Sequence, residues 1–208
     1  MFYIFVDLVL DPTAAVLAVA FLFLVFYVVG SVYGRRRVAG IVRDFSAAVK
    51  ALGGRLTGSR IGVSAAVVSC KDVGRFTELS AVVSIPPVMN PLSYLVAKLM
   101  GRKELVIVRA KHATPPKHSY TFVRKNSPAY RYASRWGKIV GESGGFVVCS
   151  SEQNLDTDAL EKHVSKLSAF GELHLISISR SLPHLQAYFL PKGSEEIKAL
   201  LDVLEKLI

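Results

Sequence analysis

Residues 14–32 read AAVLAVAFLFLVFYVVGSV, 19 residues in a row without a charged side chain, Asn or Gln. As an α-helix this run would extend about 28 Å, close to the thickness of the hydrocarbon core of a bilayer. The alternative is a cleaved signal peptide, but that would carry its basic residues before the apolar run and a small-residue cleavage site after it. The stretch therefore predicts one retained membrane-spanning helix.

The residues on either side of the run predict its direction. Arg35, Arg36 and Arg37 follow it directly, whereas the short N-terminal side carries only Asp7 and Asp11. Basic residues close to a span stay in the cytoplasm. We therefore expect a single-pass protein of the cell membrane with its N-terminus outside and its C-terminal domain in the cytoplasm.

Three regions follow from this interpretation. Residues 1–33 form the extracytoplasmic N-terminus and the transmembrane anchor, residues 34–59 a basic juxtamembrane helical linker, and residues 60–208 one cytoplasmic domain. Apolar residues recur at helical spacing from Val38 to Leu52 and end at Gly53-Gly54, a typical helix stop. We expect this helix to join the membrane to the domain.

Residues 60–208 predict an α+β fold with a mainly antiparallel sheet. Runs rich in Val and Ser on either side of residues 71–74 predict a hairpin, and Asn90 followed by Pro91 predicts a helix start. That helix has one apolar face, formed by Leu92, Leu95, Val96 and Leu99. The expected strands are residues 62–70, 77–85, 104–111, 119–124, 146–150, 172–179 and 186–190, with further helices at residues 156–169 and 194–208.

The order of these elements suggests a duplicated βαββ unit. Shifting the chain by 68 positions places Lys98-Leu99 on Lys166-Leu167 and Tyr120 on Tyr188. The identities are few, so chance agreement between two similarly built segments remains an alternative.

Positive charge is concentrated in one block. Residues 98–138 contain eleven Lys and Arg residues and one acid, Glu104, a local net charge of +10. Beside a membrane, such a block favours anionic lipid headgroups or nucleic acid, because both present dense phosphate.

Within this block, from Arg124 to Lys138, five bases are interleaved with Tyr130, Tyr132 and Trp136. We predict an RNA-binding surface there because phosphate attraction combines with stacking on unpaired bases. The alternatives to an RNA-binding surface are a membrane-facing belt and an ordinary solvated connection. We expect residues from Asn126 to Gly145 to form a long connection without a strand or helix. The predicted RNA contacts are Arg124, Lys125, Arg131, Arg135, Trp136 and Lys138.

The sequence gives little support for a catalytic site or a metal site. Residues 141–145, GESGG, match the G-x-S-x-G hydrolase pattern around Ser143, but a strand is expected after it where the nucleophile elbow needs a helix. Phosphate-binding glycine fingerprints do not occur, and no two of the five histidines have metal-ligand spacing. Cys70 and Cys149 are isolated. We expect no enzyme activity, no metal site and no cofactor.

The run from Asn90 to Val108, with its partner strand at residues 120–123, resembles the central region of the calumin family, which forms the translocon-associated PAT complex. Residues 155–160, 172–179 and 188–191 fit the next segment of that family in the same order. The resemblance covers residues 60–208 and the preceding span, and it rests on pattern and order. We expect a short prokaryotic, archaeal homologue.

The resemblance implies a non-enzymatic accessory factor that helps multipass membrane proteins insert and fold. The implied partners are the lipid bilayer, the protein-conducting channel, the ribosome and its RNA, a small membrane-protein partner and nascent multipass proteins. The family's long basic tail has no counterpart before Ile208, so an expected ribosome contact falls on residues 98–138. The alternative is a membrane-anchored scaffold whose basic surface binds anionic lipid headgroups.

Overall fold

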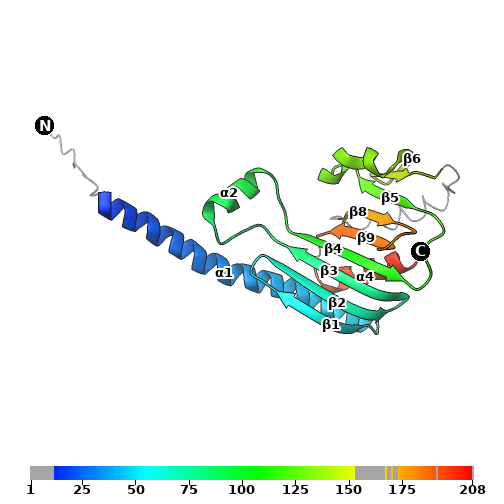
Figure 1. The fold of residues 1–208 in the computed structure, drawn as a ribbon, viewed down its shortest axis with the longest axis horizontal. Coiled ribbons are helices and arrows are strands. Elements are labelled where there is room, and N and C mark those ends of the chain that lie inside the picture. Colours follow the sequence, from blue (N-terminus) through cyan, green and yellow to red (C-terminus); the bar gives the residue numbers. More distant parts are fainter. Residues whose placement is uncertain (1–11, 153–166, 168–169, 171–172, 191, 208) are drawn as a thin grey trace.

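A computed structural model describes residues 12–152, 167, 170, 173–190 and 192–207 (Figure 1). One long helix leads into a domain that is built on a single antiparallel sheet, which confirms the expected α+β class. The elements are α1 (Pro12–Ala51), β1 (Arg55–Ile61), β2 (Ala65–Val73), β3 (Phe76–Ser84), α2 (Pro91–Leu99), β4 (Leu105–His112), β5 (Tyr120–Arg124), the 3-10 helix η1 (Pro128–Trp136), β6 (Lys138–Ser143), β7 (Phe146–Ser150), β8 (Leu173–Ile178), β9 (Leu185–Phe189) and α4 (Ser194–Glu205).

The nine strands lie in the order β1-β2-β3-β4-β9-β8-β5-β7-β6, and each neighbouring pair is antiparallel. The two halves that we expected to be a duplicated unit pair differently. β8 pairs with β9, whereas their counterparts β4 and β5 lie apart with β9 and β8 between them. The predicted helix at residues 156–169 falls almost entirely outside the described residues.

The C-terminal half of α1 and α4 pack together and cover one face of the sheet (Figure 1). Val38 and Phe45 of α1 are fully buried, as is Leu204 of α4, and all three belong to the main hydrophobic core. The juxtamembrane segment is therefore a structural element of the domain as well as its connection to the apolar stretch.

η1 covers the opposite face at the other end of the sheet. Ala133 of η1 packs with Val147 and Cys149 of β7, and Trp136 lies against this small second cluster. β7 is consequently buried on both faces along its whole length.

Two expectations about connections were wrong. The helix expected from Val38 to Leu52 is the end of α1, which stops at Ala51, but the remainder of the predicted linker, up to residue 59, is wrong because β1 begins at Arg55. The expected connection from Asn126 to Gly145 contains η1 and β6. Both missed strands form the edges of the sheet, where pairing with one neighbour holds a polar sequence in place.

Candidate membrane-facing surface

Helix α1 changes its surroundings at Gly30. Large apolar side chains from Val16 to Val29 are exposed, and this part of the helix is long and apolar enough to cross a membrane. From Gly30 onward, one residue per turn or more is buried against the domain. The helix thus has an apolar, uncovered half and a half that belongs to the core, joined without a break.

Two glycines let the domain approach α1 at this boundary. A Cβ atom added at Gly30 would lie 2.1 Å from the carbonyl oxygen of Val88, and one at Gly34 would lie 2.5 Å from that of Val63. These distances are far below van der Waals separation, so only glycine fits at either position. The segment before α2 is therefore packed directly against the backbone of α1.

α2 begins as predicted. The Asn90 side-chain oxygen accepts a hydrogen bond of 3.1 Å from the Ser93 amide, and Pro91 occupies the first turn. The helix follows the loop packed on Gly30, and Figure 1 shows it projecting from the sheet on the side toward the apolar half of α1.

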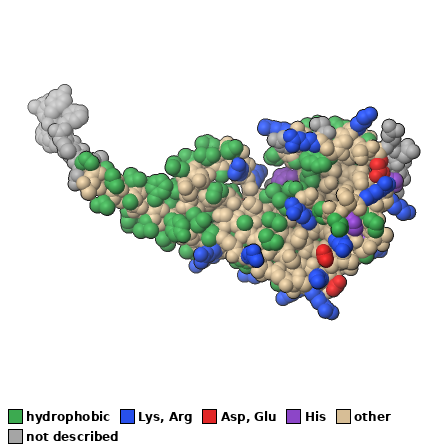
Figure 2. Space-filling view, in the orientation of Figure 1, with side chains coloured by type: hydrophobic (Ala, Val, Ile, Leu, Met, Phe, Trp, Pro, Cys, Tyr) green, Lys and Arg blue, Asp and Glu red, His purple; other side chains and the backbone are tan. Residues whose placement is uncertain are grey.

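The predicted apolar face of α2 is uncovered. Leu92 is 64% exposed and Leu99 79% exposed, with Leu95 and Val96 between them at more than half, and Ala97 is the buried residue of this helix. Figure 2 shows hydrophobic side chains gathered over α2 and along α1. Contiguous exposed apolar surface of this kind marks an interaction site for a membrane or a protein.

A bidentate ion pair connects α1 to the chain that leaves α2. The Arg37 Nε atom donates to both carboxylate oxygens of Glu104, at 2.9 and 3.0 Å, and its Nη2 atom donates to Oε2 at 2.7 Å. These hydrogen bonds raise the pKa of Arg37 above its ordinary value. Of the three predicted membrane-flanking arginines, Arg37 thus has a structural partner, while Arg35 and Arg36 are exposed.

A cavity of about 510 Å³ lies where α1, the segment before α2 and the segment after it meet. Its described lining includes Phe26 and Val29 of α1, Tyr94 of α2, and Arg102 and Lys103 beyond it. The cavity joins the apolar surface of α1 to basic side chains.

Comparison with known protein families found no family that matches this chain, and comparison with curated proteins found no match either. The resemblance to the calumin family therefore stays an expectation.

The predicted RNA contacts gather around η1, and Arg124 and Lys125 among them have internal partners. The Arg124 Nη2 atom donates to the Phe170 carbonyl oxygen at 3.1 Å, and its guanidinium lies 5.0 Å from the centre of the Phe146 ring. Lys125 forms an ion pair with Glu142, and this hydrogen bond raises the pKa of the lysine.

The other predicted contacts divide between surface and core. Trp136 packs against the small cluster beneath η1, which limits its use as a stacking platform. Arg131, Arg135 and Lys138 are exposed. Together with Lys125, whose side chain stays partly exposed in its ion pair, these residues are the accessible cations of the predicted surface.

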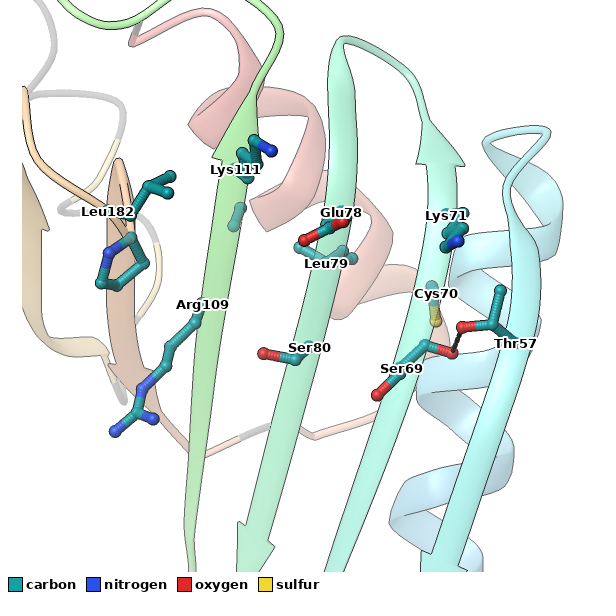
Figure 3. Close-up of a pocket in the computed structure, with 12 residues that line it drawn as sticks. Thr57, Ser69, Cys70, Lys71, Glu78, Leu79, Ser80, Arg109, Lys111 and Leu182 are labelled. Atoms are coloured by element: carbon teal, nitrogen blue, oxygen red, sulfur yellow. Dashed lines mark hydrogen bonds between the residues drawn. The ribbon is translucent and has the colours of Figure 1, made fainter.

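A second basic surface lies away from η1, and two of its cations, Arg109 and Lys111, belong to the basic block predicted at residues 98–138. The outward face of β1–β4 is open and forms a shallow cavity of about 440 Å³, in which Thr57 donates a 2.9 Å hydrogen bond to the Ser69 carbonyl oxygen (Figure 3). Lys71, Arg109 and Lys111 project from this face. The sequence signal for this face was an alternation of polar and buried residues in part of two strands, with polar residues at Ser69 and Lys71 of β2 and at Arg109 and Lys111 of β4.

The remaining candidates for chemistry occupy structural positions. Ser143 is the last residue of β6, and a hairpin connects it to β7. A strand therefore follows Ser143, as expected, where a nucleophile elbow needs a helix. His112 and His184 are buried neighbours, and the His112 amide donates to Nδ1 of His184 at 3.2 Å. Within the described part of the chain, no three His, Cys, Asp or Glu residues are grouped as a metal site would require.

Proposed function

We propose that this protein is a membrane-anchored, non-enzymatic accessory factor that acts beside the protein-conducting channel during the insertion and folding of membrane proteins. The observation that carries the proposal is the exposed apolar face of α2, held next to the uncovered half of α1. Two apolar helices beside each other suit a protein that works at the bilayer among other membrane segments.

The charge distribution supports a cytoplasmic domain. Arg35 and Arg36 are exposed just beyond the apolar stretch, whereas Asp7 and Asp11 are the charged residues before it. This asymmetry favours an N-terminus outside the cell. The domain would then face the ribosome, the channel, a small membrane-protein partner and nascent multipass proteins from the cytoplasmic side.

The exposed cations around η1 are the surface that we propose for ribosomal RNA. Neutralising a cation that touches a phosphate should lower affinity at all RNA sequences and reduce the slope of log affinity against log salt by about 1. The three residues are Arg131, Arg135 and Lys138, which lie near one edge of the sheet.

The test is cosedimentation of ribosomes with the full chain in nanodiscs over a salt series. The triple variant Arg131→Gln, Arg135→Gln, Lys138→Gln is compared with a matched control. The control, Lys50→Gln, Arg55→Gln, Arg60→Gln, removes the same charge near the opposite edge, on β1 and at the end of α1. We expect weaker binding and a smaller salt slope for the first variant only.

Equal ribosome binding by both variants would show that the proposed RNA surface is wrong. If the wild type showed no saturable binding to ribosomes and its domain bound to acidic vesicles, the proposal would be replaced by the alternative, a membrane-anchored scaffold whose basic surface binds anionic lipid headgroups. The assays distinguish these two outcomes because ribosomes present the phosphate of RNA and the vesicles present the phosphate of a bilayer, and each is added separately.

A further inference from the structure

The cavity between α1 and α2 has an apolar interior and a basic rim. Phe26, Val29 and Val88 supply apolar surface, and Arg102 and Lys103 stand at the segment that leaves α2. Its volume, about 510 Å³, is in the range of pockets that hold small ligands. A ligand that fits both parts must carry an apolar chain and an anionic group.

Glu104 is the acid in this lining, and its charge is already compensated. Both of its carboxylate oxygens accept hydrogen bonds from Arg37. Arg102 and Lys103 form no ion pair with any residue that the structure describes. The rim therefore presents net positive charge to whatever enters the cavity.

Two tyrosines indicate the depth of the cavity relative to a bilayer. Tyr33 of α1 and Tyr94 of α2 both line it, and both side chains are exposed. Tyrosine prefers the level of the lipid headgroups, because its ring is apolar and its hydroxyl is polar. The apolar residues Phe26 and Val29 lie one to two turns deeper along α1.

We infer that this cavity binds one phospholipid of the leaflet next to the domain. An acyl chain lies along Phe26 and Val29, the headgroup phosphate lies between Arg102 and Lys103, and the leucines of α2 enter the same leaflet. Continuity with the exposed apolar surface of α1 and the charge of the rim together select a lipid over a soluble phosphate. The inference requires α1 to span the membrane but does not depend on ribosome binding.

The experiment is native mass spectrometry of the full chain, purified in a mild detergent, delipidated and titrated with dioleoylphosphatidylglycerol. Arg102→Gln/Lys103→Gln is compared with Arg35→Gln/Lys98→Gln, which removes the same charge nearby at residues that do not line the cavity. We expect one tightly bound lipid in the wild type and in the control. The rim variant should bind it on the order of tenfold more weakly.

A second variant tests the apolar part of the site without touching its charge. Val29→Trp places a larger side chain in the cavity from the exposed surface of α1 and should reduce lipid binding as well. Unchanged melting temperatures of the variants confirm that they fold.

Three results would overturn the inference. Equal affinities of the rim variant and its control would mean that lipid associates without this site, and so would full binding by Val29→Trp. Displacement of the lipid by glycerol 3-phosphate at millimolar concentration would mean that the cavity recognises a soluble phosphate.

Discussion

The close packing between α1 and the segment before α2 can be tested with one methyl group. In Gly30→Ala the new Cβ atom would meet three backbone atoms: the Val88 carbonyl oxygen at 2.1 Å, the Val88 carbonyl carbon at 2.7 Å and the Met89 Cα atom at 3.0 Å. No side-chain rotation relieves this overlap. The segment has to move away from α1 by about 0.9 Å or more before the oxygen reaches even 3.0 Å.

The expected cost is the balance of two terms. Overpacking of this kind costs about 1–3 kcal/mol, whereas Ala in a helix is favoured over Gly by about 0.5–1 kcal/mol. Gly30→Ala should therefore lower the free energy of unfolding by up to about 2.5 kcal/mol, with a central value of about 1 kcal/mol. For a chain of this size, each kcal/mol corresponds to a shift in melting temperature of about 2–4 °C.

Gly40 provides the matched control, because it lies in the same helix and an added Cβ atom would meet nothing within 4 Å. Gly40→Ala should raise the melting temperature of the full chain in nanodiscs, and Gly30→Ala should lower it. Hydrogen exchange of residues 86–104 should be faster in Gly30→Ala alone. If both variants were equally stabilised and exchange were unchanged, the close packing of this segment on α1 would be refuted.

Three further predictions concern the domain. Phe45→Ala empties a fully buried position in the core and should cost about 3–5 kcal/mol in urea unfolding; a cost below about 1 kcal/mol would contradict the packing of α1 on the sheet. Burial raises the pKa of Cys70 to about 11, so its thiol should react slowly with a maleimide at pH 8 and rapidly after denaturation; equal rates would show that it is accessible. The pKa of Glu152 is lowered, first by the hydrogen bond from His118 and then by that from the Ser119 amide. Since the folded state binds this proton less tightly than the unfolded state, the stabilisation is present above the ordinary pKa of 4.5 and is lost as the pH falls through the lowered value. The melting temperature of the wild type should therefore exceed that of Glu152→Gln at pH 7, and the difference should shrink below pH 4.5; a constant difference would exclude this cause.

Local signals in the sequence predicted the turns and caps well. Gly53 ends α1 with a φ of 77°, Gly74 forms the β2–β3 turn with a φ of 57°, and Asn90 caps α2. Each of these depends on one or two residues and their own backbone, so no knowledge of distant partners was needed. The buried strands β2–β5 and β7–β9 were predicted for a similar reason, because their composition or alternation reports burial.

The features that were missed depend on partners far along the chain. β1 is exposed at all seven positions and reads RLTGSRI, so no burial pattern marks it, and it exists because it pairs with β2. Arg124 was predicted as a surface cation, but the chain brings Phe146 and Phe170 to it. For α2 the sequence predicted the apolar face, but it carried no information that the domain leaves this face uncovered.

The continuity of α1 has a consequence for how the domain would be held at a membrane. A flexible linker would let a domain rotate freely about its anchor, but here the helix that leaves the apolar stretch enters the core, with Val38 and Phe45 fully buried. The packing at Gly30 and the ion pair between Arg37 and Glu104 add two fixed points of attachment on the same side. Because α1 continues as one helix through the boundary at Gly30, the direction of the apolar stretch fixes the orientation of the sheet. If the apolar stretch spans a bilayer as proposed, α2 would lie at a set depth and the basic residues around η1 would keep a set distance from the membrane, as the proposed role beside a ribosome requires.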